Sequence, residues 1–399
     1  MIFVVDYLAP MYLRYGIPRN RVFLASEGRR LQPALSSTRT SPSKLFRRQP
    51  TCTRSSATPA TTEEYFQAEG SHGQDGVWSV VIPTYNRLPI LLKCLKSLGE
   101  QTLAPEFGLQ AYEVVVVDDG SSDSTVETLE EMKHDLPHVR LIVQSNNEGA
   151  AVARNVGVKA AKGDTIVFID SDMVVVSSFL YEHASKLHTA RGEFGDDLTF
   201  SYGRVINTDN FEDPCSEPFK LSDSSAAFFA TGNVALSRRC LMAAARSDAT
   251  ACCEGPFDTE FSEYGWEDLE LGERLRQQGT RIVQCPTAAG YHYHPAFTVD
   301  QIPALISQER QRGRNGARFF LKHPNLGVRL MVQLTPLHYG LWFLLTLGGL
   351  LNEDVWRPLV GALVRIGRPR AAQGVLSPIL NWHCVCAVRS EARALGIFT

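Results

Sequence analysis

Three short, strongly apolar segments in the first half of the chain predict buried β-strands. They are rich in β-branched residues and each ends at a proline or at small polar and acidic residues: 78–82 (WSVVI), 112–117 (YEVVVV) and 165–169 (TIVFI). Apolar residues at helical spacing predict the helices between and after them: 89–98, 125–132 and 150–161. This alternation predicts βαβ units and a mostly parallel sheet, which binds ligands at the carboxyl ends of its strands.

Acidic residues follow two of these strands. Asp118 and Asp119 follow the second, and Asp170 and Asp172 follow the third as the only D-x-D of the chain. Carboxylates that gather at one sheet edge repel one another unless a cation or hydrogen-bond donors offset the cost. Two of them on one turn can share a divalent cation that bridges a diphosphate. The pattern favours a metal site, and the alternative is that each acid only caps a turn.

Several other classes of binding site are excluded, because the chain lacks the sequence motifs that define them. The chain has neither G-x-G-x-x-G after its first strand nor G-x-x-x-x-G-K-[ST] anywhere, so it lacks the dinucleotide and P-loop fingerprints. Its nine cysteines contain no pair of C-x-x-C motifs, which excludes a zinc ribbon. Residues 61–300 carry a large excess of acids, so we expect no nucleic acid partner.

Residues 1–75 predict a disordered or targeting leader. The segment is rich in Arg, Ser and Thr and poor in acids, as organelle transit peptides are. It does not resemble a secretory signal, because Asp6 and Pro10 interrupt its apolar opening. A transit peptide would direct the protein to an organelle such as a plastid, and the other expected location is the cytosolic face of a membrane. The alternatives are an untargeted leader or a start codon assigned too far upstream.

Residues 301–399 predict a basic, apolar helical extension. Residues 330–352 carry no charge and are long enough in principle to cross a hydrocarbon layer of about 30 Å. Polar residues crowd the first half of that stretch, and basic residues mixed with Phe319 precede it. The pattern favours peripheral membrane contact through residues 305–351 over spanning. The alternative is a helical subdomain that packs on the core.

Five motifs in fixed order carry a resemblance to a known family. They are VIPTYNR (81–87), VVDDGS (116–121), NEG to ARN (147–155), DSD (170–172) and GWED (265–268). Together they resemble the nucleotide-binding half and the acceptor-side acidic motif of family 2 glycosyltransferases. The resemblance covers about residues 77–300. It implies a GT-A fold over 76–300, that is, a Rossmann-like, mixed and mostly parallel sheet flanked by helices.

The resemblance also implies roles for individual residues on the donor side. Those expected to bind the nucleotide sugar are Pro83, Tyr85, Asp118, Asp119, Arg154 and Asp170. Those expected to bind a metal are Asp170, Asp172 and one of His292 and His294. The ion implied is Mn or Mg, because oxygen ligands and phosphate suit hard cations. Both histidines fall on the same face of a strand, so the sequence does not choose between them, and a structural role for both stays open.

On the acceptor side, the resemblance implies that Asp268 is the catalytic base, with Glu267 beside it. Both acids open a predicted helix, where the helix dipole favours the ionised carboxylate. The alternative is that they only cap this helix. Gly232, Asn233 and Trp266 are expected to contact the acceptor.

The leading hypothesis is an inverting, metal-dependent glycosyltransferase. It would move a sugar from a nucleotide sugar, UDP-linked in this hypothesis, to a hydroxyl of a glycan or lipid-linked acceptor. One alternative is a catalytically silent carbohydrate- or nucleotide-binding module on the same fold. A second is a sugar-1-phosphate nucleotidyltransferase, which the absence of glycine between Pro83 and Pro89 disfavours.

Overall fold

The computed structural model describes residues 74–220, 223, 227–246 and 255–397. The predicted leader, 1–75, lies outside the described residues except for Gln74 and Asp75, which begin the first strand.

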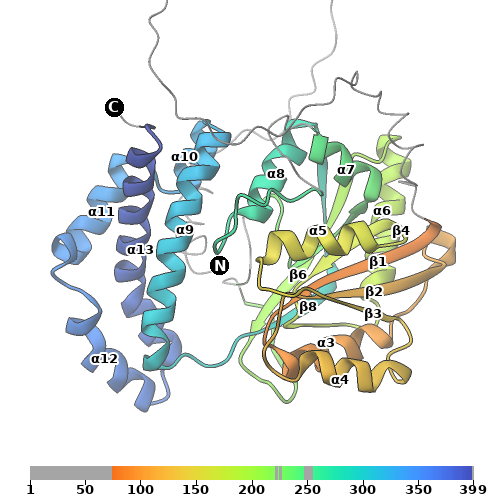
Figure 1. The fold of residues 1–399 in the computed structure, drawn as a ribbon, viewed down its shortest axis with the longest axis horizontal. Coiled ribbons are helices and arrows are strands. Elements are labelled where there is room, and N and C mark those ends of the chain that lie inside the picture. Colours follow the sequence, from red (N-terminus) through yellow and green to blue (C-terminus); the bar gives the residue numbers. More distant parts are fainter. Residues whose placement is uncertain (1–73, 221–222, 224–226, 247–254, 398–399) are drawn as a thin grey trace, which may run out of the picture. The chain divides into compact units, whose positions relative to one another are not determined.

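The described chain forms one mixed sheet of eight strands (Figure 1). The strands are β1 (Gln74–Thr84), β2 (Ala111–Asp118), β3 (Val139–Val143), β4 (Gly163–Ile169), β5 (Met173–Val175), β6 (Thr199–Thr208), β7 (Asn233–Ser237) and β8 (Arg281–Tyr293). Their order in the sheet is β3-β2-β1-β4-β7-β6-β8-β5. β1 to β4 pair in parallel, whereas β7 is antiparallel to both of its neighbours and β5 is antiparallel to β8. The three predicted strands and the mostly parallel sheet are confirmed.

Helices cover both faces of the sheet. They are α3 (Leu88–Gly99), α4 (Thr125–Glu131), α5 (Ala150–Ala160), α6 (Phe179–Phe194), α7 (Arg238–Arg246) and α8 (Glu267–Gln277). Val80 and Ile82 of β1 pack into one core with α3, and the alternate residue Val81 packs into a second core with α5. α5 approaches β1 closely at Gly157, where a Cβ would lie 2.4 Å from a methyl group of Val81. The start of α5 is thereby fixed against the strand ends.

The predicted helical extension is present after the last strand. It consists of α9 (Ile302–Lys322), α10 (Leu326–Met331), α11 (Pro336–Thr346), α12 (Glu353–Arg365) and α13 (Pro369–Ala394). α13 packs against α9, α11 and α12 (Figure 1). Leu269 of α8 shares a hydrophobic cluster with Phe319 of α9 and Val388 of α13. The extension is therefore joined to α8, the helix predicted to carry the base.

Most of the basic side chains of α9, which were expected to take part in a membrane contact, form ion pairs with acids of the protein. The pairs are Arg312 with Glu309, Arg314 with Glu263, Arg318 with Glu391, and Lys322 with Asp258 and Glu260. Phe319 is fully buried, whereas Arg310 is exposed. The sequence could not reveal these acids as partners, because most of them lie far from α9 along the chain.

The uncharged stretch does not form one membrane-spanning helix. Residues Leu326–Gly349 are long and apolar enough by composition, and a third of the most apolar window is buried. The stretch is divided between α10 and α11, with left-handed backbone at Gln333 (φ 60°) and Leu347 (φ 49°). α11 has 11 residues and so is about 16 Å long, against a hydrocarbon thickness of about 30 Å.

Candidate active site

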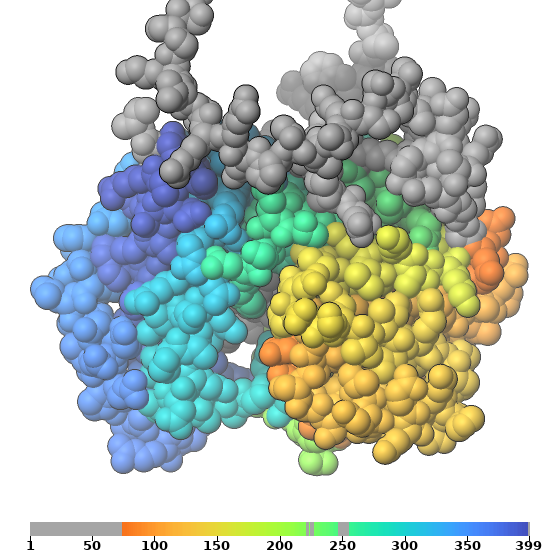
Figure 2. All heavy atoms as spheres, viewed as in Figure 1, coloured from red at the N-terminus to blue at the C-terminus, as the bar shows by residue number. Residues whose placement is uncertain are grey.

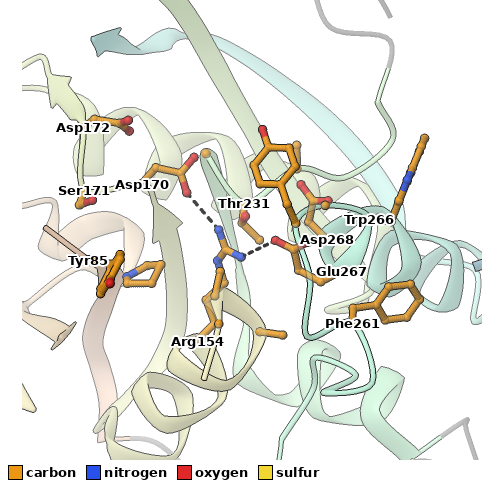
Figure 3. Close-up of a pocket in the computed structure, with 18 of the residues that line it drawn as sticks. Tyr85, Arg154, Asp170, Ser171, Asp172, Thr231, Phe261, Trp266, Glu267 and Asp268 are labelled. Atoms are coloured by element: carbon orange, nitrogen blue, oxygen red, sulfur yellow. Dashed lines mark hydrogen bonds and ion pairs between the residues drawn. The ribbon is translucent and has the colours of Figure 1, made fainter. Parts of the chain in front are cut away.

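A cavity of about 570 Å³ lies where the parallel strands end and α8 begins (Figure 3). It brings together most of the predicted site residues: Pro83, Tyr85, Asp119, Arg154, Asp170, Asp172, Gly232, Trp266, Glu267, Asp268, His292 and His294. Asp118 and Asn233 are not among its lining residues. Strand ends from β1 and β4 thus face the first turn of α8 across one space.

Two aspartates and a histidine form a cluster that fits a divalent cation. One ligand atom each of Asp170, Asp172 and His292 lies within 4.8 Å of the others. Pairing of β5 with β8 places Met173 opposite His292, and His292 Nε2 lies 2.9 Å from Asp172 Oδ1. That oxygen is buried and accepts no hydrogen bond among the described residues. Two carboxylates and an imidazole suit Mn or Mg. His294 contacts the His292 ring edge to face (ring centroids 4.0 Å apart) without joining the cluster.

Arg87 contributes a cation that the sequence analysis did not assign to the site. It lines the cavity and pairs with Asp172, although its own side chain is 52% exposed. The preceding Asn86 is left-handed (φ 52°), and its side chain accepts hydrogen bonds from the backbone N–H of Ser122 and Asp123. This turn aims Arg87 at the aspartates. The basic residue directly after the β1 motif was the only signal in the sequence.

Arg154 joins the metal cluster to the acids of α8. It is 5% exposed, and its guanidinium donates to Asp170 Oδ1 (3.1 Å) and to Glu267 Oε1 (3.0 Å), as Figure 3 shows. Burial opposes its charge, but the carboxylates of Asp170, Glu267 and Asp268 outweigh burial and raise the pKa of Arg154. Arg154 is therefore a buried part of the site and not an exposed side chain on the surface of α5.

Asp118 and Asp119 have separate surroundings. Asp119 accepts hydrogen bonds from the backbone N–H of Glu148 (2.8 Å) and Gly149 (2.9 Å) and so holds the start of α5 at the cavity wall. Burial raises the pKa of Asp119. Asp118 is fully buried and accepts from the backbone N–H of Ser121 (2.9 Å). Of the two, only Asp119 lines the cavity, where a ligand can reach it.

A left-handed turn sets Asp268 at the start of α8. Gly265 and Trp266 both have positive φ (89° and 80°), a costly conformation for tryptophan. Asp268 is 3% exposed and accepts a hydrogen bond from the backbone N–H of Leu269 (2.8 Å). Burial, followed by the charge of Glu267, raises the pKa of Asp268 to about 7. A carboxyl group that exchanges its proton near neutrality suits general base catalysis.

The C-terminal helix α9 holds this turn in place. The Trp266 indole N–H donates to the Arg312 carbonyl (2.7 Å). The fully buried Asn315 amide donates to the carbonyls of Glu263 (2.8 Å) and Gly265 (3.1 Å). Arg312 also lines the cavity. No sequence motif pointed to these residues, because the resemblance ends before α9.

Of the two neighbouring residues predicted to contact the acceptor, Gly232 and Asn233, only Gly232 lines the cavity. Gly232 lines the cavity, and a Cβ there would lie 3.3 Å from an oxygen of Asp170. The prediction that Asn233 contacts the acceptor is wrong. Its side chain is fully buried and bonds to His183 Nε2 (2.9 Å) and to the carbonyls of Arg204 (3.0 Å) and Ala288 (2.9 Å). Asn233 has the structural role of joining strands.

The fold and the site together define a class of protein. A mixed, mostly parallel sheet carries acids at its strand ends, and a buried carboxyl faces them across one cavity. This is the arrangement of a glycosyltransferase of the GT-A fold. Residues 79–239 match the family described as Glycosyl transferase family 2. The chain therefore carries a family 2 glycosyltransferase domain.

Comparison with characterised proteins gives relatives of the same class. The chain is 27% identical to the chondroitin synthase of Escherichia coli over 66% of its length and 39% of that protein. It is 28% identical to the hyaluronan synthase of Pasteurella multocida over 59% of its length and 26% of that protein. The chain thus spans well under half the length of these two relatives. A mannosyltransferase of Pyrobaculum calidifontis, solved with GDP-Man and Mn2+, is 19% identical with a TM-score of 0.46, covering 82% of this chain and 88% of that one.

Proposed function

We propose that the protein is an inverting, metal-dependent glycosyltransferase. It would transfer a sugar from a nucleotide sugar, UDP-linked in this proposal, to a hydroxyl of a glycan or lipid-linked acceptor. The observation that carries the proposal is the position of Arg154, which bonds at once to Asp170 of the metal cluster and to Glu267 beside the base. The leaving-group side and the acceptor side of the cavity are thereby held at a fixed separation.

The residues divide the reaction between them. Asp170, Asp172 and His292 would hold Mn or Mg, which supplies positive charge to the departing diphosphate when it is bound. Asp268 takes the proton of the acceptor hydroxyl as its oxygen bonds to the anomeric carbon. The bond from that carbon to the diphosphate breaks, and the nucleoside diphosphate leaves with the electron pair. A single displacement of this kind inverts the anomeric configuration.

The silent binding module is the rival. It requires no base, so it leaves the buried carboxyl of Asp268 at the start of α8 with no role beyond capping that helix. The names of two relatives, chondroitin synthase and hyaluronan synthase, support a glycan as acceptor. A lipid-linked acceptor would place the protein at the cytosolic face of a membrane.

A thermal-shift panel of nucleoside diphosphates and nucleotide sugars, with and without Mn2+, tests donor and metal together, since a ligand that binds the native state raises Tm. Turnover is then measured as release of nucleoside diphosphate. Asp268→Asn should keep the Tm rise and lose turnover, whereas Asp300→Asn, at an exposed position outside the cavity, should keep both. An active Asp268→Asn variant would remove Asp268 from its role. Donor binding without turnover in the native protein, across a panel of acceptors, would favour the silent module.

A further inference from the structure

α11 packs on the protein with its least apolar side. Its buried residues are His338, Trp342 and Thr346, which recur every fourth position and form one narrow stripe. The residues exposed along α11 and the turn after it are Leu337, Leu341, Phe343, Leu344, Leu345, Leu347 and Leu350. We call these seven residues the α11 face. A soluble helix normally buries its apolar side, so the α11 face is inverted.

The exposure of this face is extensive. Leu337 is 71% exposed, Leu344 69% and Leu350 75%. Single exposed leucines are common on soluble proteins, but a contiguous apolar patch marks an interaction site. Figure 1 shows α11 on the outer side of α13, and Figure 2 shows this blue C-terminal segment at the molecular surface. Within the described residues, no other segment packs over the face.

The net charge of the C-terminal helices favours an anionic partner. No charged residue occurs between 330 and 352, and after residue 322 the chain has seven arginines and three acids. Arg357, Arg365 and Arg368 are exposed. Of the acids, Glu353 faces His383 (3.3 Å), Glu391 pairs with Arg318 (3.2 Å) and Asp354 is exposed. An uncharged apolar face on a region of net positive charge matches the boundary between the headgroups and acyl chains of an anionic bilayer.

The aromatic residues in and next to the face fit the same surroundings. Tyr339, Phe343 and Trp382 form a cluster with ring centroids 5.3 to 6.2 Å apart. Tyrosine and tryptophan are enriched at the level of lipid headgroups. A second copy of the chain suits the face less well, because a twofold contact would bring together two copies of the same region of net positive charge.

We propose that the α11 face docks the protein on the surface of an anionic lipid bilayer, with α11 lying in the interface. The contact narrows the range predicted from sequence, residues 305–351, to α11 and the turn after it, with the exposed leucines of α11 and not the arginines of α9 at the bilayer. It would set the cavity near the membrane, since α11 packs on α13 and α13 on α9, which lines the cavity. The docking itself does not depend on the proposed chemistry.

Quenching of tryptophan fluorescence by brominated phosphatidylcholine, in vesicles that also contain phosphatidylglycerol, tests the proposal on the full chain. Three of the five tryptophans, at 342, 356 and 382, lie in α11 to α13, and none lies before residue 74. The quenching therefore reports on the C-terminal helices even if the basic leader also binds lipid. Flotation with the same vesicles in about 0.5 M salt removes most of the leader's electrostatic contribution.

The variant Leu337→Ser/Leu344→Ser/Leu350→Ser should abolish quenching and lower vesicle affinity at high salt at least about tenfold, because buried leucines dominate such binding. Its Tm should not change, since these side chains are exposed. Leu103→Ser/Val143→Ser, at positions 42% and 51% exposed in the catalytic domain, is the matched control and should bind as the native protein does. Arg365→Gln/Arg368→Gln should lose only the preference for anionic over neutral vesicles.

Three results would overturn the proposal. One is quenching that the triple leucine substitution leaves unchanged. A second is a native dimer in light scattering that the triple variant converts to monomer while vesicles bind neither protein, which would assign the face to a second copy. The third is full glycosyltransferase activity with a soluble acceptor and no vesicle binding, which would refute the docking alone.

Discussion

The raised pKa of Asp268 predicts a steep dependence of activity on pH. A base acts in its ionised form, so turnover should rise as pH passes through the pKa, which is about 7. About 9% of such a group is ionised at pH 6 and about 91% at pH 8, so kcat/KM, which reports the pKa of the free enzyme, should rise about tenfold between them. A carboxyl at the ordinary value of 3.8 would be ionised throughout and give a flat profile. The effect of burial and of Glu267 on the pKa of Asp268 should therefore appear in the pH profile of the activity.

The assay is the initial rate of nucleoside diphosphate release at subsaturating substrate, which gives kcat/KM, from pH 5.5 to 8.5. The pKa of His292 is lowered by burial, so its imidazole stays neutral across the upper part of this range. Asp268→Asn should lower kcat/KM by about a hundredfold to ten-thousandfold and flatten the profile. A native profile that is flat from pH 6 to 8, or a sloping profile retained in the Asn variant, would refute the assignment of the titrating group.

Three further predictions concern the cavity and the sheet. Arg154→Ala should lower the free energy of unfolding by about 3 kcal/mol in urea titrations, because Asp170 and Glu267 lose their shared cation, and a stability equal to that of the native protein would contradict this. Gly203→Ala should cost about 1–3 kcal/mol, since its Cβ would lie 2.2 Å from Asn233 Oδ1. A chelator should remove the Tm rise given by the nucleotide and Mn2+ should restore it, whereas a rise that persists in the chelator would speak against the metal cluster.

The fold could be predicted because its central strands are local features. Residues 78–82, 112–117 and 165–169 are apolar on both faces, as strands covered by helices on both sides must be. Parallel strands end at one edge, so the acids that follow β2 and β4 had to come close together. Their convergence with α8 was implied only by the family resemblance.

The parts that were missed depend on contacts between distant residues. Asn233 looks like a turn residue in the sequence, but its partners in β6, β8 and α6 appear only when the sheet is assembled. The basic residues of α9 look like a membrane face until Glu263 and Asp258, about 50 residues upstream or more, neutralise them. Pairing of this kind leaves no periodicity along the chain.

The turn at Gly265 and Trp266 is held by hydrogen bonds to Arg312 and Asn315 of α9. This dependence constrains how segments of related enzymes can be exchanged. A chimera that joins the donor half of one homologue to the acceptor half of another at residue 300 would set this turn against a foreign α9. The direction of the Asp268 carboxylate, which follows this turn, would then differ from one chimera to the next. Productive exchanges should instead transplant 263–268 together with 302–322 as one cassette.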